Sequence, residues 1–118
     1  MPMNPLQKAS QIDEMIRSSD LCLIYFSGSS CPICEPLRRK VETLLVSFPS
    51  IKSGFLDAEE HPEVVGPYQI FTVPLFLFFV QGKETLREGK YVDIRELADK
   101  ISRYYDLFSD NREIGGRR

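Results

Sequence analysis

The chain has 118 residues, which is enough for one domain of ordinary size. Its composition is 42% hydrophobic and 27% charged, close to the globular average, so a folded core is expected rather than disorder. The formal net charge of −2 provides no basic field for nucleic acid or for acidic membrane surfaces, and neither partner is expected.

The first half of the chain predicts a helix, a buried strand and a second helix. Asn4 is a good capping residue and Pro5 suits the first helical position, so the first helix is expected to begin there. Residues 21–26 (LCLIYF) form a continuous apolar run that predicts a strand buried on both faces. A second helix is expected from about 32 to 48. Its basic run at 38–40 is interpreted as solvated surface, with a docking patch for acidic partners as the alternative. The apolar face of this helix consists of Leu37, Val41, Leu44, Leu45 and Phe48.

The second half predicts further strands around a short helix. Residues 53–58 suit a short strand, and 61–70 suit a short helix that a Gly-Pro pair prevents from continuing far. Residues 73–80 (VPLFLFFV) predict a second deeply buried strand. A turn at 81–84 then leads to an antiparallel partner strand at 85–89.

The last helix is expected to follow Asp93, which stands three residues before Glu96 in capping-box spacing. The order of elements predicts an α/β fold with a mixed central sheet and helices on both faces. The two most apolar strands should lie at the centre of that sheet. We expect one domain over 1–118, with a core from about 5 to 108 and a flexible tail at 109–118 that has little to bury.

Two cysteines, Cys31 and Cys34, enclose Pro32 and Ile33 directly after the first buried strand. A helix is predicted to open here, and the free N–H groups and partial positive charge of a helix N-terminus stabilise a thiolate. Two intervening residues let the second sulfur reach the first within one helical turn. Cys31 is therefore expected to attack a substrate disulfide and Cys34 to release the mixed disulfide, with no bound cofactor.

The same pair allows three other interpretations. Zinc would need four ligands, and only Cys22, in mid-strand, and His61, before a proline, could complete the set; no metal is expected. A purely structural disulfide would close a loop too short to add much stability. A redox-inactive module that binds partners through its surface is the third interpretation. Cys22 itself suits a buried core position.

The first twenty residues contain acidic side chains and no continuous apolar segment of signal-peptide length. The longest apolar run, at 73–80, is too short to cross a membrane. Three cysteines are also too few for a disulfide-stapled scaffold. We therefore expect a cytoplasmic protein without membrane association.

From about residue 6 to 107, the chain resembles the thioredoxin family. The likeness rests on LCLIYFSGSS leading into CPIC (21–34), LDAEEHPEVVGPYQI (56–70), TVP (72–74), and FFVQGKE (78–84) continuing to Gly89. The resemblance implies a thioredoxin fold and thiol–disulfide oxidoreductase activity. It also implies that Pro74 follows a cis peptide bond beside the two sulfurs and that the Val73 backbone pairs with an extended substrate chain. Pro32 and Ile33 are expected to complete the substrate-binding surface.

Several positions depart from the usual family pattern. The dipeptide between the cysteines is Pro-Ile and not Gly-Pro, and Pro36 is displaced from the usual kink proline, whose place Arg39 takes. Ser30 stands where thioredoxins carry a tryptophan, Tyr25 where they carry a buried aspartate, and Phe55 where a lysine accompanies that aspartate. A glutaredoxin-like, glutathione-dependent reductase is the alternative within the redox class, although the glycine pair and acidic residue that hold glutathione are not evident near 87–93. The expected partners are protein or small-molecule disulfides and an unidentified reductant, and the protein is expected to be a monomer.

Overall fold

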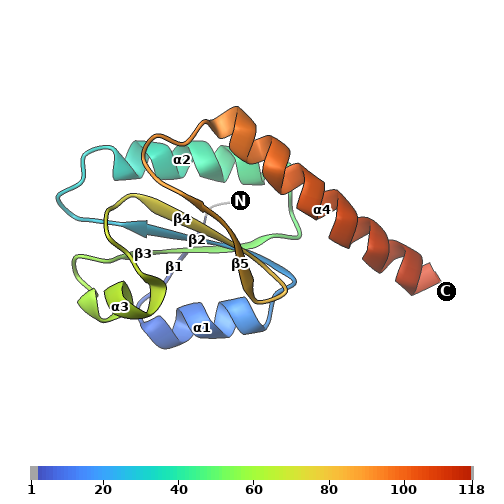
Figure 1. The fold of residues 1–118 in the computed structure, drawn as a ribbon, viewed down its shortest axis with the longest axis horizontal. Coiled ribbons are helices and arrows are strands. Elements are labelled where there is room, and N and C mark those ends of the chain that lie inside the picture. Colours follow the sequence, from blue (N-terminus) through green and yellow to red (C-terminus); the bar gives the residue numbers. More distant parts are fainter. Residues whose placement is uncertain (1–2, 118) are drawn as a thin grey trace.

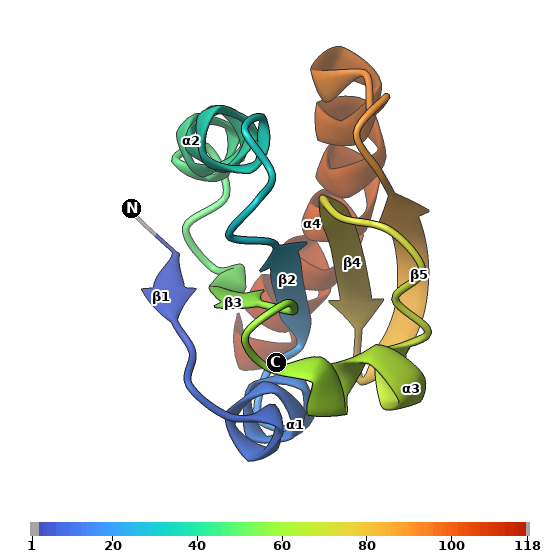
Figure 2. The ribbon, with the colours of Figure 1, turned by 90° about the vertical axis from the view of Figure 1, so that its left-hand side faces the viewer.

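A five-stranded mixed sheet forms the middle layer of the protein (Figures 1 and 2). The structure is a computed structural model that describes residues 3–117, with side chains described for residues 3–108. The strands are β1 (Asn4–Pro5), β2 (Leu21–Ser27), β3 (Lys52–Asp57), β4 (Leu75–Val80) and β5 (Lys83–Glu88). The helices are α1 (Ala9–Arg17), α2 (Cys34–Leu45), the 3₁₀ turn η1 (Pro62–Val64), α3 (Val65–Tyr68) and α4 (Ile94–Arg117).

The strand order is β1-β3-β2-β4-β5. β1 and β2 both pair with β3 in parallel, whereas β4 pairs antiparallel with β2 and with β5. The mixed sheet is therefore as predicted. The two strands with the most apolar sequences, β2 and β4, lie next to each other inside it, which confirms their expected place.

Two hydrophobic cores lie on opposite faces of this sheet. Figure 1 shows α2 and α4 on one face and α1 and α3 on the other. Because side chains alternate along a strand, β2 contributes to both cores and is buried along nearly its whole length. Leu21, Leu23 and Tyr25 enter the core beside α2 and α4, whereas Cys22, Ile24 and Phe26 enter the core beside α1 and α3.

The predicted start of the first helix is wrong. Asn4 and Pro5 form the short edge strand β1, and α1 begins at Ala9. The buried Met3 side chain and a hydrogen bond from the Leu6 N–H to the Phe55 carbonyl (2.8 Å) hold this segment against β3. Pro5 is tolerated because an edge strand can do without one N–H donor. The Gln11 side-chain oxygen accepts hydrogen bonds from the N–H groups of Gln7 (2.6 Å) and Lys8 (3.2 Å) at the true start of α1.

The β4–β5 turn is shorter than the predicted 81–84, because β5 already begins at Lys83, whereas the start of α4 is as predicted. Gln81 and Gly82 both have positive φ angles, 50° and 82°, as a two-residue hairpin of the primed type requires. Asp93 precedes α4, and its Oδ1 accepts hydrogen bonds from the N–H groups of Arg95 (2.9 Å) and Glu96 (3.2 Å). The aspartate cap is confirmed.

Helix α4 continues to Arg117, beyond the core boundary near 108 that the sequence predicted. Its described side chains against the core are Ile94, Leu97, Ile101, Tyr104, Tyr105 and Phe108. Side chains from 109 onward lie outside the described part, so the flexible tail stays a prediction. Across 3–117, none of the helices combines the length and apolar character that a membrane crossing needs.

Candidate active site

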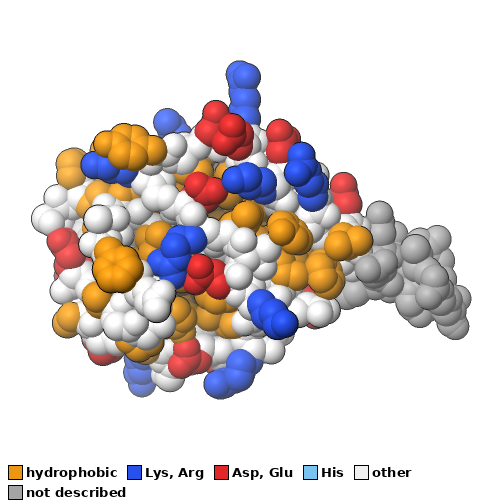
Figure 3. All heavy atoms as spheres, in the orientation of Figure 1, with side chains coloured by type: hydrophobic (Ala, Val, Ile, Leu, Met, Phe, Trp, Pro, Cys, Tyr) orange, Lys and Arg blue, Asp and Glu red, His pale blue; other side chains and the backbone are white. Residues whose placement is uncertain are grey.

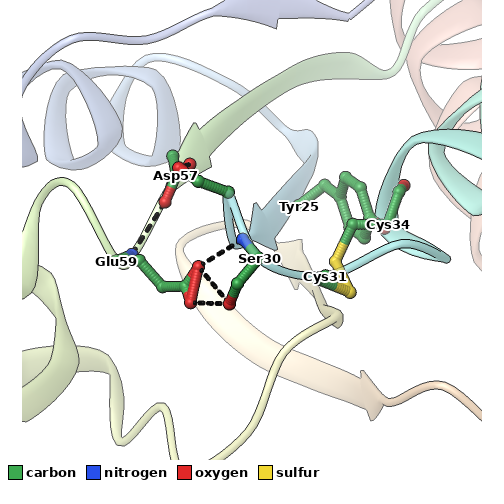
Figure 4. The surroundings of a disulfide bond; sticks show 7 residues. Tyr25, Ser30, Cys31, Cys34, Asp57 and Glu59 are labelled. Carbon is green, nitrogen blue, oxygen red and sulfur yellow. Dashed lines mark hydrogen bonds between the residues drawn. A yellow bond between two sulfur atoms is a disulfide. The ribbon is translucent and has the colours of Figure 1, made fainter.

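The loop between β2 and α2 carries the cysteine pair. Cys31 and Cys34 form a disulfide, with Cα atoms 5.5 Å apart (Figure 4). The predicted helix start near Pro32 is wrong, because Pro32 and Ile33 form a turn and α2 begins at Cys34. That turn is closed by a hydrogen bond from the Cys34 N–H to the Cys31 carbonyl (3.3 Å). Cys31 therefore stands just before the helix N-terminus.

The two cysteines differ in their access to solvent. Cys34 is only 3% exposed, whereas Cys31 is partly exposed and is followed by exposed Pro32 and Ile33. A substrate approaching from solution therefore meets Cys31 first. Cys34 is buried and is bonded to the Cys31 sulfur.

Tyr25 lies beneath the second cysteine. Its hydroxyl donates a hydrogen bond to the Cys34 carbonyl (2.6 Å), and its ring stacks on Phe76 with centroids 4.5 Å apart. Burial raises the pKa of Tyr25 well above its usual value, and the nearby Arg38 charge offsets this only in part. The phenol is therefore neutral at working pH and cannot accept a proton from a thiol.

The turn after β3, residues 57–60, fastens the loop that leads to Cys31; we call it the acidic turn. Ser29 Oγ donates to Asp57 Oδ2 (2.5 Å). The Ser30 N–H donates to Glu59 Oε1 (2.8 Å), and Ser30 Oγ donates to Glu59 Oε2 (2.6 Å), as Figure 4 shows. These contacts were not predicted from the sequence. The signal was present, because β2 and β3 are parallel and the segments after both strands meet at one edge of the sheet.

Hydrogen bonding sets the charge state of the acidic turn. Hydrogen bonds from Ser30 lower the pKa of Glu59. Partial burial raises the pKa of Asp57, but hydrogen bonds from Ser29 and from the N–H groups of Glu60 and Glu59 outweigh it, so this pKa is also lowered. Both carboxylates are ionised at neutral pH and are occupied in holding the loop.

The Val73–Pro74 peptide bond is cis, as the family resemblance implies. Pro74 is buried and directly precedes β4. Val73 lies beside the cysteine loop, since a Cβ atom at Gly28 would come within 3.0 Å of Val73 Cγ2. The structure thus places Val73 next to the segment that leads to Cys31. Contact of Val73, Pro74, Pro32 and Ile33 with a substrate stays a prediction.

The basic run at 38–40 is not uniformly solvated surface. Arg39 and Lys40 are exposed, but Arg38 lies partly buried with its guanidinium over the Phe55 ring, 4.1 Å from the centroid. Helix periodicity explains the difference, because Arg38 follows Cys34 by one turn and shares its inward side. The prediction is wrong for Arg38.

The remaining candidate metal ligands lie apart from the cysteine pair. Cys22 is fully buried in β2, and burial raises the pKa of its thiol to about 12. His61 lies in the turn after β3, and its Nδ1 is 3.3 Å from Glu63 Oε2. Among the residues that the structure describes, no group of three or more His, Cys, Asp or Glu side chains could hold a metal ion.

Comparisons with known proteins agree with this geometry. The family model described as Thioredoxin matches residues 4–104. The chain is 34% identical over 106 residues to the thioredoxin-like protein YdfQ of Bacillus subtilis, covering 90% of this chain and 95% of that protein. It is 30% identical over 99 residues to human glutaredoxin-3, covering 81% of this chain but only 29% of that longer protein.

A solved structure shows the same fold. A mutant thioredoxin from Halobacterium salinarum superposes with a TM-score of 0.78 at 23% identity, covering 88% of this chain and 91% of that one. The fold and the cysteine pair support thiol–disulfide oxidoreductase activity in general. With the family match spanning most of the chain, this protein belongs to the thioredoxin family.

Proposed function

We propose that the protein exchanges electrons with disulfides of protein substrates through Cys31 and Cys34. In the reduced protein, the Cys31 thiolate attacks one substrate sulfur, and the other substrate sulfur leaves as a thiolate. Cys34 then attacks the Cys31 sulfur and forms the internal disulfide, and the substrate sulfur that was bonded to Cys31 leaves as a thiolate. A separate thiol reductant returns the pair to the dithiol state.

The unequal exposure of the two cysteines carries this proposal. An attacking sulfur must be reached by a partner protein, whereas a resolving sulfur needs to reach only the first sulfur. The partly exposed Cys31 and the 3% exposed Cys34 match these two roles. The position of Cys31 just before α2 also favours the thiolate over the thiol.

Exposed apolar side chains at this end of the sheet support a protein substrate. The antiparallel pairing of β4 with β2 and β5 brings the loops before β4 and after β5 to the end where Cys31 lies. Phe71 and Tyr91 lie in these two loops and are 88% and 89% exposed, and Ile33, between the two cysteines, is 45% exposed. Figure 3 shows exposed hydrophobic side chains at this end, on the left, together with a few acidic and basic ones. Aromatic and apolar side chains of this kind are enriched at protein interfaces.

Turnover of a protein disulfide such as that of insulin, with a dithiol as electron source, tests the proposal. Cys31→Ser should abolish turnover, because no attacking sulfur remains. Cys34→Ser should accumulate a mixed disulfide between Cys31 and the substrate, detectable by mass spectrometry. Cys22→Ala is the matched control and should turn over like the unmodified protein. Turnover that survives Cys31→Ser would overturn the proposal.

Two alternatives give different outcomes. A redox-inactive binding module would show no reversible two-electron transition when the protein is equilibrated in graded glutathione buffers, whereas the proposal requires that transition. A glutathione-dependent reductase would turn over with glutathione and glutathione reductase as the only electron source. We expect a dithiol reductant to be required.

A further inference from the structure

A partly buried cation lies behind the cysteine pair. The Arg38 Nη1 donates to Glu42 Oε2 (2.9 Å), and the two side chains are only 22% and 17% exposed. Glu42 is itself held by the Met3 N–H (2.8 Å). With the Phe55 ring on one side and Glu42 on another, the guanidinium is fixed in place. The next residue, Arg39, is 71% exposed and pairs with Glu35.

A pocket of about 260 Å³ joins this cation to the sulfurs. Cys31, Cys34, Arg38 and Phe55 all line it, together with Glu35 and the segment 27–29. A charge acts more strongly across such a partly enclosed space than across bulk water, because the local dielectric constant is lower. Arg38 is therefore placed to act on a charge that develops at Cys34.

The other groups around the pocket are poor partners for such a charge. Tyr25, from β2, is neutral, and its hydroxyl is bound to the Cys34 carbonyl. Asp57, from β3, accepts from Ser29 and is negative. Glu35, from α2, lines the pocket but would repel a thiolate, and its Oε1 accepts from Arg39 Nη2 (2.7 Å). Arg38 is thus the one cation among the described residues that line this pocket.

We propose that Arg38 stabilises the Cys34 thiolate during the resolving step. The inference rests on the proposed function. In that step the Cys34 thiol gives its proton to water in the pocket, and the resulting thiolate attacks Cys31. The new Cys31–Cys34 bond forms as the bond from Cys31 to the substrate breaks. The substrate sulfur leaves with the electron pair and takes a proton from solvent, so the step needs no other oxidant or reductant.

Titration of Cys34 in a Cys31→Ser background tests Arg38 directly, without turnover. Ultraviolet absorbance of the thiolate against pH gives the thiol pKa, and the buried Cys22 thiol, with its pKa raised to about 12, stays silent over the working range. Arg38→Gln should raise the Cys34 pKa by about one unit, the lower end of the effect of a nearby opposite charge, because water in the partly enclosed pocket screens part of it. Lys40→Gln, two positions away on the same helix, should leave that pKa unchanged, because Lys40 is exposed and does not line the pocket.

The rate of resolution gives a second readout. One pKa unit lowers the thiolate fraction about tenfold, but the more basic thiolate is a better nucleophile and recovers about a factor of three. Release of a mixed disulfide from Cys31 near neutral pH should therefore slow about threefold in Arg38→Gln, and the loss should shrink as pH rises.

Two further variants separate charge from packing. Arg38→Lys keeps a cation and should restore most of the pKa and rate, whereas Arg38→Met keeps the aliphatic stem and should behave like Arg38→Gln. Equal effects of Arg38→Gln and Lys40→Gln, or no effect of Arg38→Gln, would overturn the role of Arg38. Absence of a redox transition in the unmodified protein would instead remove the proposed function, so the two failures are distinguishable.

Discussion

The Tyr25 side chain connects the centre of the sheet to the first residue of α2. Its ring packs on Phe76 inside the core, while its hydroxyl reaches the Cys34 carbonyl. A carboxylate at this position would place a negative charge near the second sulfur. The buried phenol instead supplies one neutral hydrogen bond and adds no charge. The charged groups behind the disulfide are therefore Arg38 and its partner Glu42. Tyr25 is therefore a positioning residue and not a base.

Tyr25→Phe removes that hydrogen bond while keeping the stacked ring. Because the bond is buried, the free energy of unfolding of the oxidised protein should fall by about 1–2 kcal/mol. Chemical denaturation measures the difference. Tyr91→Phe is the matched control, since the Tyr91 side chain is 89% exposed and should contribute almost nothing. Equal stabilities of Tyr25→Phe and the unmodified protein would show that the Cys34 carbonyl finds another donor.

At the scale of elements, hydrogen bonds join the two loops that follow the neighbouring parallel strands β2 and β3. The loop after β2 carries Ser29 and Ser30, and the acidic turn after β3 carries Asp57 and Glu59. The fit is close at Gly28, where a Cβ atom would approach the Glu59 carboxyl carbon to 2.8 Å. Glycine is needed there because the acidic turn occupies the space of a side chain. The position of Cys31 thus depends on contacts made by β3 as well as by its own strand.

The double variant Asp57→Asn/Glu59→Gln should make stability less sensitive to acid. Both carboxyl pKa values are lowered by folding, so their stabilisation is present above the ordinary carboxyl range near pH 4 and is lost as pH falls through the lowered values. The thermal midpoint should fall less between about pH 5 and pH 3 in the variant than in the unmodified protein.

The control for this comparison is Glu14→Gln, which breaks an exposed ion pair with Arg17 on α1. It should shift the midpoint little at any pH. An acid response of the double variant identical to that of the unmodified protein would mean that the acidic turn does not hold the loop in solution.

The sequence correctly predicted the features of the fold that have strong local signals. Apolar runs located β2 and β4, Asp93 located the start of α4, and the cysteine spacing with TVP located the site. The errors fall where long-range contacts override local preference. Asn4 and Pro5 suit a helix start, but pairing with β3 makes them a strand. The inward place of Arg38 and the bonds from Ser29 and Ser30 to the acidic turn depend on contacts across the sheet that no local pattern contains.

At the scale of the whole molecule, β2 links both cores and the active site. One of its faces packs under α2 and α4, the other packs over α1 and α3, and its end leads into the cysteine loop. Cys22 lies in this strand, opposite Phe79 of β4 and Lys52 of β3. Exposing its thiol requires separating the sheet from a helix layer, which amounts to opening most of the fold.

Alkylation of the reduced protein should therefore follow a fixed order. Cys31 should react first near neutral pH, at a rate that hardly depends on denaturant, because it is already partly exposed. Cys22 should react last, since its thiol is fully buried and its pKa is raised to about 12. In a Cys31→Ser/Cys34→Ser variant, the labelling rate of Cys22 should rise with denaturant concentration. The slope should equal that of the free energy of global unfolding, because the thiol is exposed only when the whole domain opens. Mass spectrometry of quenched samples gives both rates. A Cys22 rate that is fast without denaturant, or that rises with a much smaller slope, would show that the layer of α1 and α3 opens while the rest of the sheet stays folded.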